Sequence, residues 1–114
     1  MTTVGLGARP GVSAEEVLAA VDAVLPPGAA AVRLATLDTR AAEPGFVAAA
    51  ARRGWPLTGH SSEALARVPV PTPSPAVADA VGTASVAEAA ALLGGGTLIV
   101  PKTAYGRVTV AVAS

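Results

Sequence analysis

Short apolar runs alternate with helix-start signals along this chain, and this alternation constrains its fold more than any other feature. The apolar runs have the length of buried strands, and most of them are followed by a stretch with helical periodicity. We expect strands over residues 3–6, 32–37, 55–58, 97–100 and 107–113. An alternating order of strands and helices is typical of an α/β domain, in which helices cover both faces of one sheet.

The expected helix starts are marked by capping residues. Ser13 and Glu16 form a capping box, in which the serine accepts a hydrogen bond from the backbone near Glu16 and the glutamate reaches back. Ser85 and Glu88 form a second capping box, and Pro44 occupies the first turn of a helix. We expect helices over residues 13–25, 44–53, 64–68, 74–82 and 85–93.

The last two expected strands are separated by a short turn that contains Gly106. A turn of this length cannot make a parallel crossover, so these strands should form an antiparallel hairpin. We therefore predict one domain over residues 1–114 with a three-layer α/β/α architecture. Its sheet should be mixed and mostly parallel, with about five strands, and should end in an antiparallel C-terminal hairpin.

The composition argues against several functions. Eight basic and eight acidic residues give a formal net charge of zero, whereas a nucleic-acid-binding domain is expected to be basic. Cysteine is absent, so the chain can form neither a disulfide nor a thiolate metal site. The first residues do not resemble a signal peptide, and no apolar run is long enough to span a membrane. We expect a cytoplasmic protein with no metal centre.

Polar side chains gather in the loops that follow the first three expected strands. The carboxyl ends of parallel strands meet at one edge of a sheet, and ligands usually bind there. Helix N-termini at the same edge offer unpaired N–H groups to an anion. The sequence therefore predicts a ligand site at this edge. The polar residues of these loops are Arg9, Asp38, Thr39, Arg40, Glu43, His60, Ser61 and Ser62.

Two features of these loops allow other interpretations. Gly5, Gly7 and Gly11 follow the spacing GxGxxxG instead of GxGxxG, so they either hold a nicotinamide or flavin cofactor, with Asp38 on its ribose, or only make a tight turn. His60 is the one histidine of the chain. It is a candidate for acid–base catalysis beside Asp38, for an axial metal ligand, or for an ordinary polar loop residue.

Two further groups of residues are candidates for binding an acidic ligand. Lys102 and Arg107 flank the final turn, where they either are solvated or bind a carboxylate. The hydroxyls of Thr72 and Ser74 either cap a helix or lie before N–H groups that cradle an anion.

The most distinctive segment is PVPTPSPAVADAVGTASVAEAAALL at residues 69–93, which is followed by LIVPKTAYGRVTVAVA. With VGLGARPGVSAEEV and LATLDTRAAEPGF earlier in the chain, these motifs occur in the same order as in one family. The chain resembles the cobalamin-biosynthesis CobE family, which is similar to the C-terminal domain of CbiG. The resemblance implies a role in building the corrin ring. The longer relatives are cobalt-precorrin-5A hydrolases, which open a lactone, and stand-alone versions are associated with the aerobic branch.

The resemblance also implies functional positions, with four departures. Ala8 stands where cysteine or serine is common, Pro10 where a second basic residue is frequent, Arg40 where lysine is usual and Thr72 where asparagine is typical. Ala8 provides no nucleophile at its position. The positions that match the family's motifs are Gly5, Gly7, Arg9, Gly11, Ser13, Glu16, Thr36, Asp38, Glu43, Gly45, Pro71, Pro73, Ser74, Gly82, Ser85, Glu88, Lys102 and Thr109.

A corrin precursor is an apolar macrocycle that carries many acetate and propionate groups. A site for it requires cations and helix N-termini at the rim of a floor of small side chains. The predicted function is the binding or processing of a carboxylated precorrin or corrinoid intermediate, which is a ligand or substrate and not a resident cofactor. The expected ligand-binding residues are Gly7, Arg9, Gly11, Asp38, Arg40, Glu43, Thr72, Ser74 and Lys102.

Two alternative functions stand beside this prediction. The first is a lactone-opening hydrolase of the cobalt-precorrin-5A type, for which the candidate catalytic residues are His60, Asp38 and Glu43. The second is a non-catalytic module that docks on a methyltransferase of the cobalamin pathway, with the proline-rich loop as the contact.

Overall fold

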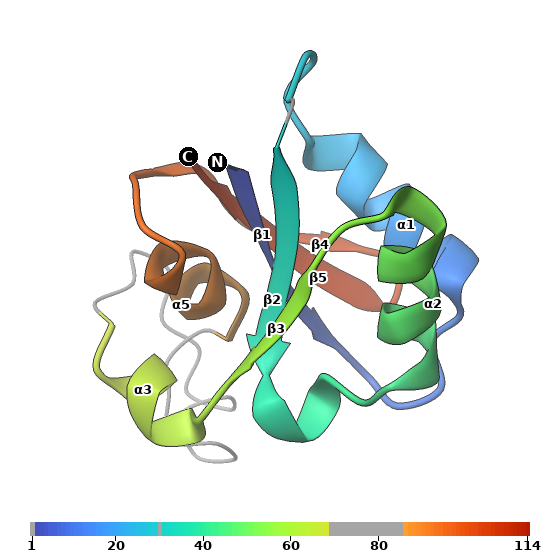
Figure 1. Cartoon of the computed structure of the whole chain (residues 1–114), viewed down its shortest axis with the longest axis horizontal. Coiled ribbons are helices and arrows are strands. Elements are labelled where there is room, and N and C mark those ends of the chain that lie inside the picture. Colours follow the sequence, from blue (N-terminus) through green and yellow to red (C-terminus); the bar gives the residue numbers. More distant parts are fainter. Residues whose placement is uncertain (1, 30, 69–85) are drawn as a thin grey trace.

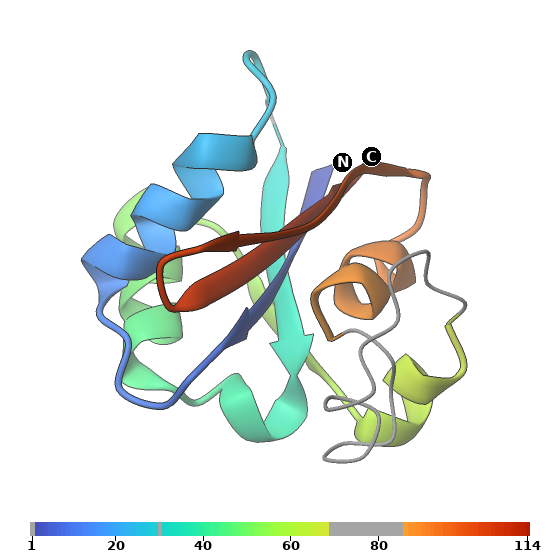
Figure 2. The same ribbon diagram turned by 180° about the vertical axis from the view of Figure 1, so that it is seen from behind.

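The computed structural model describes residues 2–29, 31–68 and 86–114. In this part of the chain a five-stranded sheet is covered by helices on both faces (Figure 1 and Figure 2). The strand order across the sheet is β3-β2-β1-β5-β4. The strands are β1 (Thr2–Ala8), β2 (Val32–Leu37), β3 (Leu57–His60), β4 (Leu98–Tyr105) and β5 (Val108–Ala113).

The sheet is mixed, as the sequence predicts. β1 pairs in parallel with β2, and β2 pairs in parallel with β3. β5 runs antiparallel to both of its neighbours, β1 and β4, so it is the one reversed strand of the described sheet. The predicted C-terminal hairpin is confirmed, and Gly106 lies in its turn with a φ of +61° that favours glycine.

One face of the sheet is covered by α1 (Ala14–Val24) and α2 (Pro44–Arg53). Both helices place small and branched apolar side chains on the sheet, together with the fully buried ring of Phe46. α2 begins with Pro44 in its first turn and ends at Gly54, whose φ of +67° is left-handed. This face forms the larger of the hydrophobic clusters, around Val4, Leu6 and Leu34 of the sheet.

The opposite face is covered by the short helices α3 (Ser62–Ala66) and α5 (Val86–Leu93). The buried residues of α5 are four alanines and Glu88. Gly5 of β1 lies directly beneath this helix, and a Cβ atom there would collide with the carbonyl oxygen of Ala87. The alanines and Gly5 therefore let α5 approach the sheet closely on this side.

Four strands differ from their predicted bounds, and β5 does so only by beginning one residue later, at Val108. β1 extends to Ala8 because its pairing with β5 continues to Val108, past its last pair with β2 at Gly5. β3 begins at Leu57, two residues later than expected, since the N–H of Trp55 donates to Ala50 at the end of α2. β4 continues past Pro101, where a bulge in the edge strand accommodates a proline that breaks the apolar pattern.

The predicted helices at residues 13–25, 44–53 and 85–93 correspond to α1, α2 and α5. The helix expected around residues 64–68 lies slightly earlier, because Ser61 caps it by accepting from the N–H of Ala64. The proline-rich loop, the helix at residues 74–82 and the capping residue Ser85 lie outside the described residues. None of the described helices combines the length and the apolar character that a membrane crossing requires.

Candidate functional site

The carboxyl ends of β1, β2 and β3 meet at one edge of the sheet, in the lower part of Figure 1. The loop after β1, the short 3-10 helix η1 (Asp38–Arg40) after β2 and the N-terminus of α3 after β3 all begin there. The hairpin turn lies at the same edge, since Ala8 pairs with Val108. The topology therefore brings the predicted polar loops to one edge.

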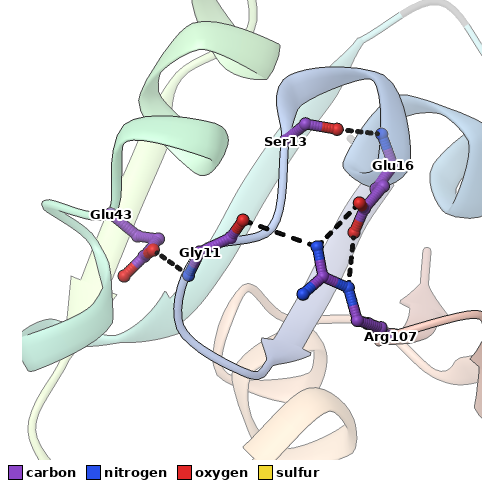
Figure 3. A network of polar contacts seen from close by, with 5 residues as sticks. All are labelled: Gly11, Ser13, Glu16, Glu43 and Arg107. Atoms are coloured by element: carbon purple, nitrogen blue, oxygen red, sulfur yellow. Dashed lines mark hydrogen bonds and ion pairs between the residues drawn. The ribbon is translucent and has the colours of Figure 1, made fainter.

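Arg40 and Glu43 bind the loop that follows β1. The Nη2 atom of Arg40 donates to the carbonyl oxygen of Ala8 at 2.6 Å. The Oε1 atom of Glu43 accepts from the N–H of Gly11 at 2.8 Å, as Figure 3 shows. Gly11 has a φ of +86°, which favours glycine at this position of the loop. These contacts fix the loop and occupy groups that were candidates for ligand binding.

Arg107 also has a partner within the protein, the carboxylate of Glu16. Its guanidinium donates to both carboxylate oxygens of Glu16, at 2.7 and 3.1 Å (Figure 3). This pairing raises the pKa of Arg107, chiefly through the hydrogen bond to Glu16. Ser13 caps α1 as predicted, with its Oγ accepting from the N–H of Glu16 at 3.1 Å. The second half of the predicted capping box is wrong, because the carboxylate of Glu16 binds Arg107 instead of reaching back.

Beside this ion pair is an open depression with a volume of about 400 Å³. It lies between α1 and the hairpin turn, on the face opposite α5. The residues that line it are Glu15, Glu16, Ala19, Tyr105, Gly106 and Arg107. Its acidic side chains already pair with arginines, Glu15 with Arg52 and Glu16 with Arg107.

The three candidate catalytic residues do not form one hydrogen-bonded group. Leu57 packs on the α1 and α2 side of β3, and a Cβ atom at Gly59 would lie 2.9 Å from the Cα atom of Asp38. Because side chains alternate along a strand, His60 lies on the other face, away from Asp38. Among the described residues His60 has no hydrogen bond to a carboxylate. The hydrolase interpretation stays a prediction without a contact in its support.

The environment of His60 favours the neutral imidazole. Partial burial lowers its pKa from the ordinary value of 6.5, and the positive charge of Arg33 lowers it further. Arg33 is itself fixed across the sheet, donating to Thr3 Oγ1 at 3.1 Å and to the carbonyl oxygen of Gly94 at 2.7 Å. His60 is therefore a half-buried imidazole at the end of β3 whose surroundings disfavour protonation, with no cluster of possible metal ligands around it in the described part of the chain.

On the face of the sheet that α5 covers, small residues of β1, β5 and β4 lie side by side near the carboxyl edge. Gly5 and Ala111 pair with each other beneath α5, and the next residues on this face, Gly7 and Thr109, pair with each other beyond the helix. Ala104 of β4 pairs with Thr109 from the other side. Among the described residues, a Cβ atom at Gly7 would have only the Cβ atom of Thr109 nearby, at 3.9 Å. We call Gly7, Ala104 and Thr109 the small-residue floor.

Two predicted cations remain without a partner in the described part of the chain. Lys102 is half-buried on β4, where it lies opposite Ala111, a residue of the face that α5 covers and that also carries the small-residue floor. Arg9 is exposed in the loop after β1. Neither side chain forms a hydrogen bond or an ion pair among the described residues. Thr72 and Ser74, the other candidate ligand-binding residues, lie outside those residues.

Sequence reasoning missed two parts of this arrangement. Ala104 was not singled out, although its alternation with Lys102 on one strand could have indicated a shared face. Glu88 was expected as a capping residue and as a motif position of the family, but not as a fully buried side chain that accepts from the N–H of Lys102 at 2.9 Å. No sequence signal predicts this contact, because it depends on how α5 lies against the edge strand.

Comparison with known proteins gives consistent results. The family model described as cobalamin synthesis G C-terminus matches residues 2–113. The crystal structure of CobE, described as a protein from the cobalamin (vitamin B12) biosynthetic pathway, is 30% identical and has a TM-score of 0.85, covering 99% of this chain and 92% of that one. Cobalamin biosynthesis protein chiG from Agrobacterium tumefaciens str. C58 is 35% identical with a TM-score of 0.75, covering 99% and 97%. No curated protein matches the chain.

Proposed function

This chain belongs to the cobalamin synthesis G C-terminus family, and on that premise we propose that it binds a carboxylated precorrin or corrinoid intermediate. Family membership makes it a protein of the cobalamin biosynthesis pathway. The proposed site is the small-residue floor at the carboxyl end of the sheet, with Lys102 and Arg9 as the cations at its rim. The ligand acts there as a bound intermediate or substrate and not as a resident cofactor.

The single observation that carries this proposal is the contrast between Gly5 and Gly7. α5 packs directly on Gly5, whereas two residues along the same face only Thr109 lies near Gly7 among the described residues. A surface of glycine, alanine and threonine lets a flat macrocycle approach the backbone closely, as larger side chains would not. The position at the carboxyl end of parallel strands is also where α/β domains commonly bind ligands.

The charges at this edge suit a ligand with several carboxylates. Arg40, Glu43 and Arg107 already hold contacts within the protein, so we assign the leading ligand contacts to other cations. Lys102 and Arg9 keep their charges unpaired among the described residues. Charge-assisted hydrogen bonds from such groups to a carboxylate are the stronger kind, which favours a polycarboxylate over a neutral ligand.

The proposal is tested by titrating the purified protein with hydrogenobyrinic acid and following its visible absorption. We expect a saturable spectral change. Lys102→Ala and Arg9→Ala should each weaken binding about tenfold, the loss expected from removing one charge-assisted contact. Gly7→Val should weaken it further, because the valine side chain would take the room that the ligand needs on the proposed floor, while the strand backbone tolerates valine.

Arg52→Ala is the matched control, because it removes an exposed cation whose ion pair with Glu15 joins α1 and α2 on the other face. This variant should bind the pigment as the wild type does. Unchanged affinity in both Lys102→Ala and Arg9→Ala would refute the proposed site. A folded wild-type protein that gives no spectral change would refute pigment binding and would favour a docking module for a pathway methyltransferase.

A further inference from the structure

Glu88 is a charged side chain that the protein buries completely. It lies in the first turn of α5, and its relative exposure is 0%. Burying a carboxylate costs free energy unless hydrogen bonds compensate, so its position calls for a specific partner. One such partner is the backbone of the edge strand, since Glu88 Oε2 accepts from the N–H of Lys102 at 2.9 Å.

The contact falls on an irregularity of β4. The pairing with β5 is regular from Thr103 to Tyr105, but the register shifts between Val100 and Thr103. The shift includes Pro101 and Lys102, which together lie opposite the single residue Ala111 of β5, as in a β-bulge. β4 is an edge strand, and water could satisfy an outward N–H on such a strand. The need of the Lys102 N–H for a hydrogen-bond acceptor therefore does not by itself explain why a carboxylate is buried beside it.

From this juxtaposition we infer that Glu88 is a positioning residue, which anchors the bulge of β4 and thereby fixes Lys102 at the rim of the small-residue floor. The side chains of Glu88 and Lys102 do not form an ion pair among the described contacts, so the anchor acts on the backbone of Lys102 and leaves its ammonium group for a ligand. An ammonium group on a fixed backbone loses less conformational freedom when it binds a carboxylate. The inference has two halves. The anchoring of the bulge stands by itself, and only the positioning of Lys102 for a ligand rests on the proposed function.

The anchoring half is tested without any ligand. Glu88→Gln keeps the reach of the side chain and an accepting oxygen but loses the charge. Glu88→Asp keeps the charge, but the missing methylene withdraws the carboxylate by about 1.5 Å and takes it out of hydrogen-bond range of the Lys102 N–H. Amide hydrogen exchange followed by NMR should show a protected Lys102 N–H in the wild type and in Glu88→Gln. In Glu88→Asp the protection should fall about tenfold.

The control in this measurement is the N–H of Val110, which lies in β5 between β1 and β4. Its protection should be the same in all three proteins, and this would show that Glu88→Asp is folded. A Lys102 N–H that exchanges equally fast in the wild type and in Glu88→Asp would overturn the anchoring. If Glu88→Asp does not fold, hydrogen exchange in the wild type and in Glu88→Gln tests the anchoring. An unprotected Lys102 N–H in the wild type would overturn the inference by itself.

The positioning half is tested by titration with hydrogenobyrinic acid. Glu88→Gln should bind within about twofold of the wild type, and Glu88→Asp about tenfold more weakly. Glu88→Asp combined with Lys102→Ala should bind no more weakly than Lys102→Ala alone, because both changes remove the same contact. Additive losses, or equal affinity of the wild type and Glu88→Asp, would overturn the positioning role.

These measurements separate the two proposals. If the wild type binds no pigment, the proposed function and the ligand half of the inference both fail, while hydrogen exchange still judges the anchor. If the wild type binds pigment and Lys102→Ala weakens binding, but Glu88→Asp changes nothing, the proposed function stands and the inference fails.

Discussion

At the residue scale, Gly5 and Gly7 place the same residue type in two opposite environments on one face of β1. A Cβ atom at Gly5 would collide with the backbone of Ala87 and would lie 2.8 Å from the amide nitrogen of Ala91. Both obstacles belong to the backbone of α5, which cannot rotate away as a side chain can. A Cβ atom at Gly7 would have the Cβ atom of Thr109 as its only described neighbour.

Gly5→Ala should therefore destabilise the protein by about 2–3 kcal/mol, because α5 must move away from the sheet to accept the methyl group. Gly7→Ala should change the free energy of unfolding by less than about 0.5 kcal/mol. Urea denaturation of the two variants beside the wild type measures both effects. Equal losses of stability in the two variants would show that α5 does not lie on Gly5.

His60 gives the protein a pH dependence at the residue scale. Its pKa is lowered in the folded state by burial and by Arg33, so the unfolded chain binds the proton more readily. Stability from this group is complete above the ordinary pKa of 6.5 and is lost as the pH falls from there through the lowered pKa. Wild type should lose more stability than His60→Gln between about pH 7.5 and about pH 5.

Urea midpoints at the two pH values measure this difference. The exposed carboxylates whose pKa values are also lowered, Glu15 and Asp22, titrate below this window and are present in both proteins. Their contribution therefore cancels in the comparison. Parallel pH profiles for the wild type and His60→Gln would exclude a lowered pKa for His60.

At the element scale, α1 depends on its cap. The Oγ atom of Ser13 accepts from the N–H of Glu16 at 3.1 Å and satisfies one of the free N–H groups of the first turn. Ser13→Ala should destabilise the protein by about 1 kcal/mol, whereas Ser13→Thr keeps a capping oxygen and should cost less. Thermal unfolding followed by circular dichroism ranks the three proteins. An alanine variant as stable as the wild type would mean that Ser13 does not cap α1.

At the scale of the whole molecule, the core is built from small residues around one large ring. Hydrophobic residues make up 52% of the chain and aromatic residues only 3%, so most buried side chains contribute little area each. Phe46 is the one phenylalanine and is fully buried between α2 and the sheet. Alanine, valine and leucine around it cannot easily collapse into the space that its ring fills.

Phe46→Ala should destabilise the protein by about 3–5 kcal/mol, which is a large share of the roughly 5–15 kcal/mol typical of a domain. Phe46→Leu should cost less, because leucine keeps most of the buried volume. Denaturant unfolding measures both variants. A loss of less than about 1 kcal/mol in Phe46→Ala would show that the core around this ring is loosely packed.

The order of the described elements and the mixed character of the sheet could both be predicted from local sequence signals. Capping serines, prolines in first turns and glycines at helix ends act within a few residues of the chain, so their effect can be read locally. The short turn at Gly106 required an antiparallel hairpin for the same reason. The motif combination also indicated the family, which the comparison confirmed.

The contacts between polar residues, in contrast, became known from the packed fold alone. It paired Glu16 with Arg107 and Glu43 with Gly11, it separated His60 from Asp38 across β3, and it brought Glu88 to the backbone of Lys102. Each of these results depends on register, since a shift of one residue moves a side chain to the other face of a strand. These contacts join residues that are 14 to 91 positions apart in the chain. No short sequence motif indicates them, because they follow from how whole helices and strands pack.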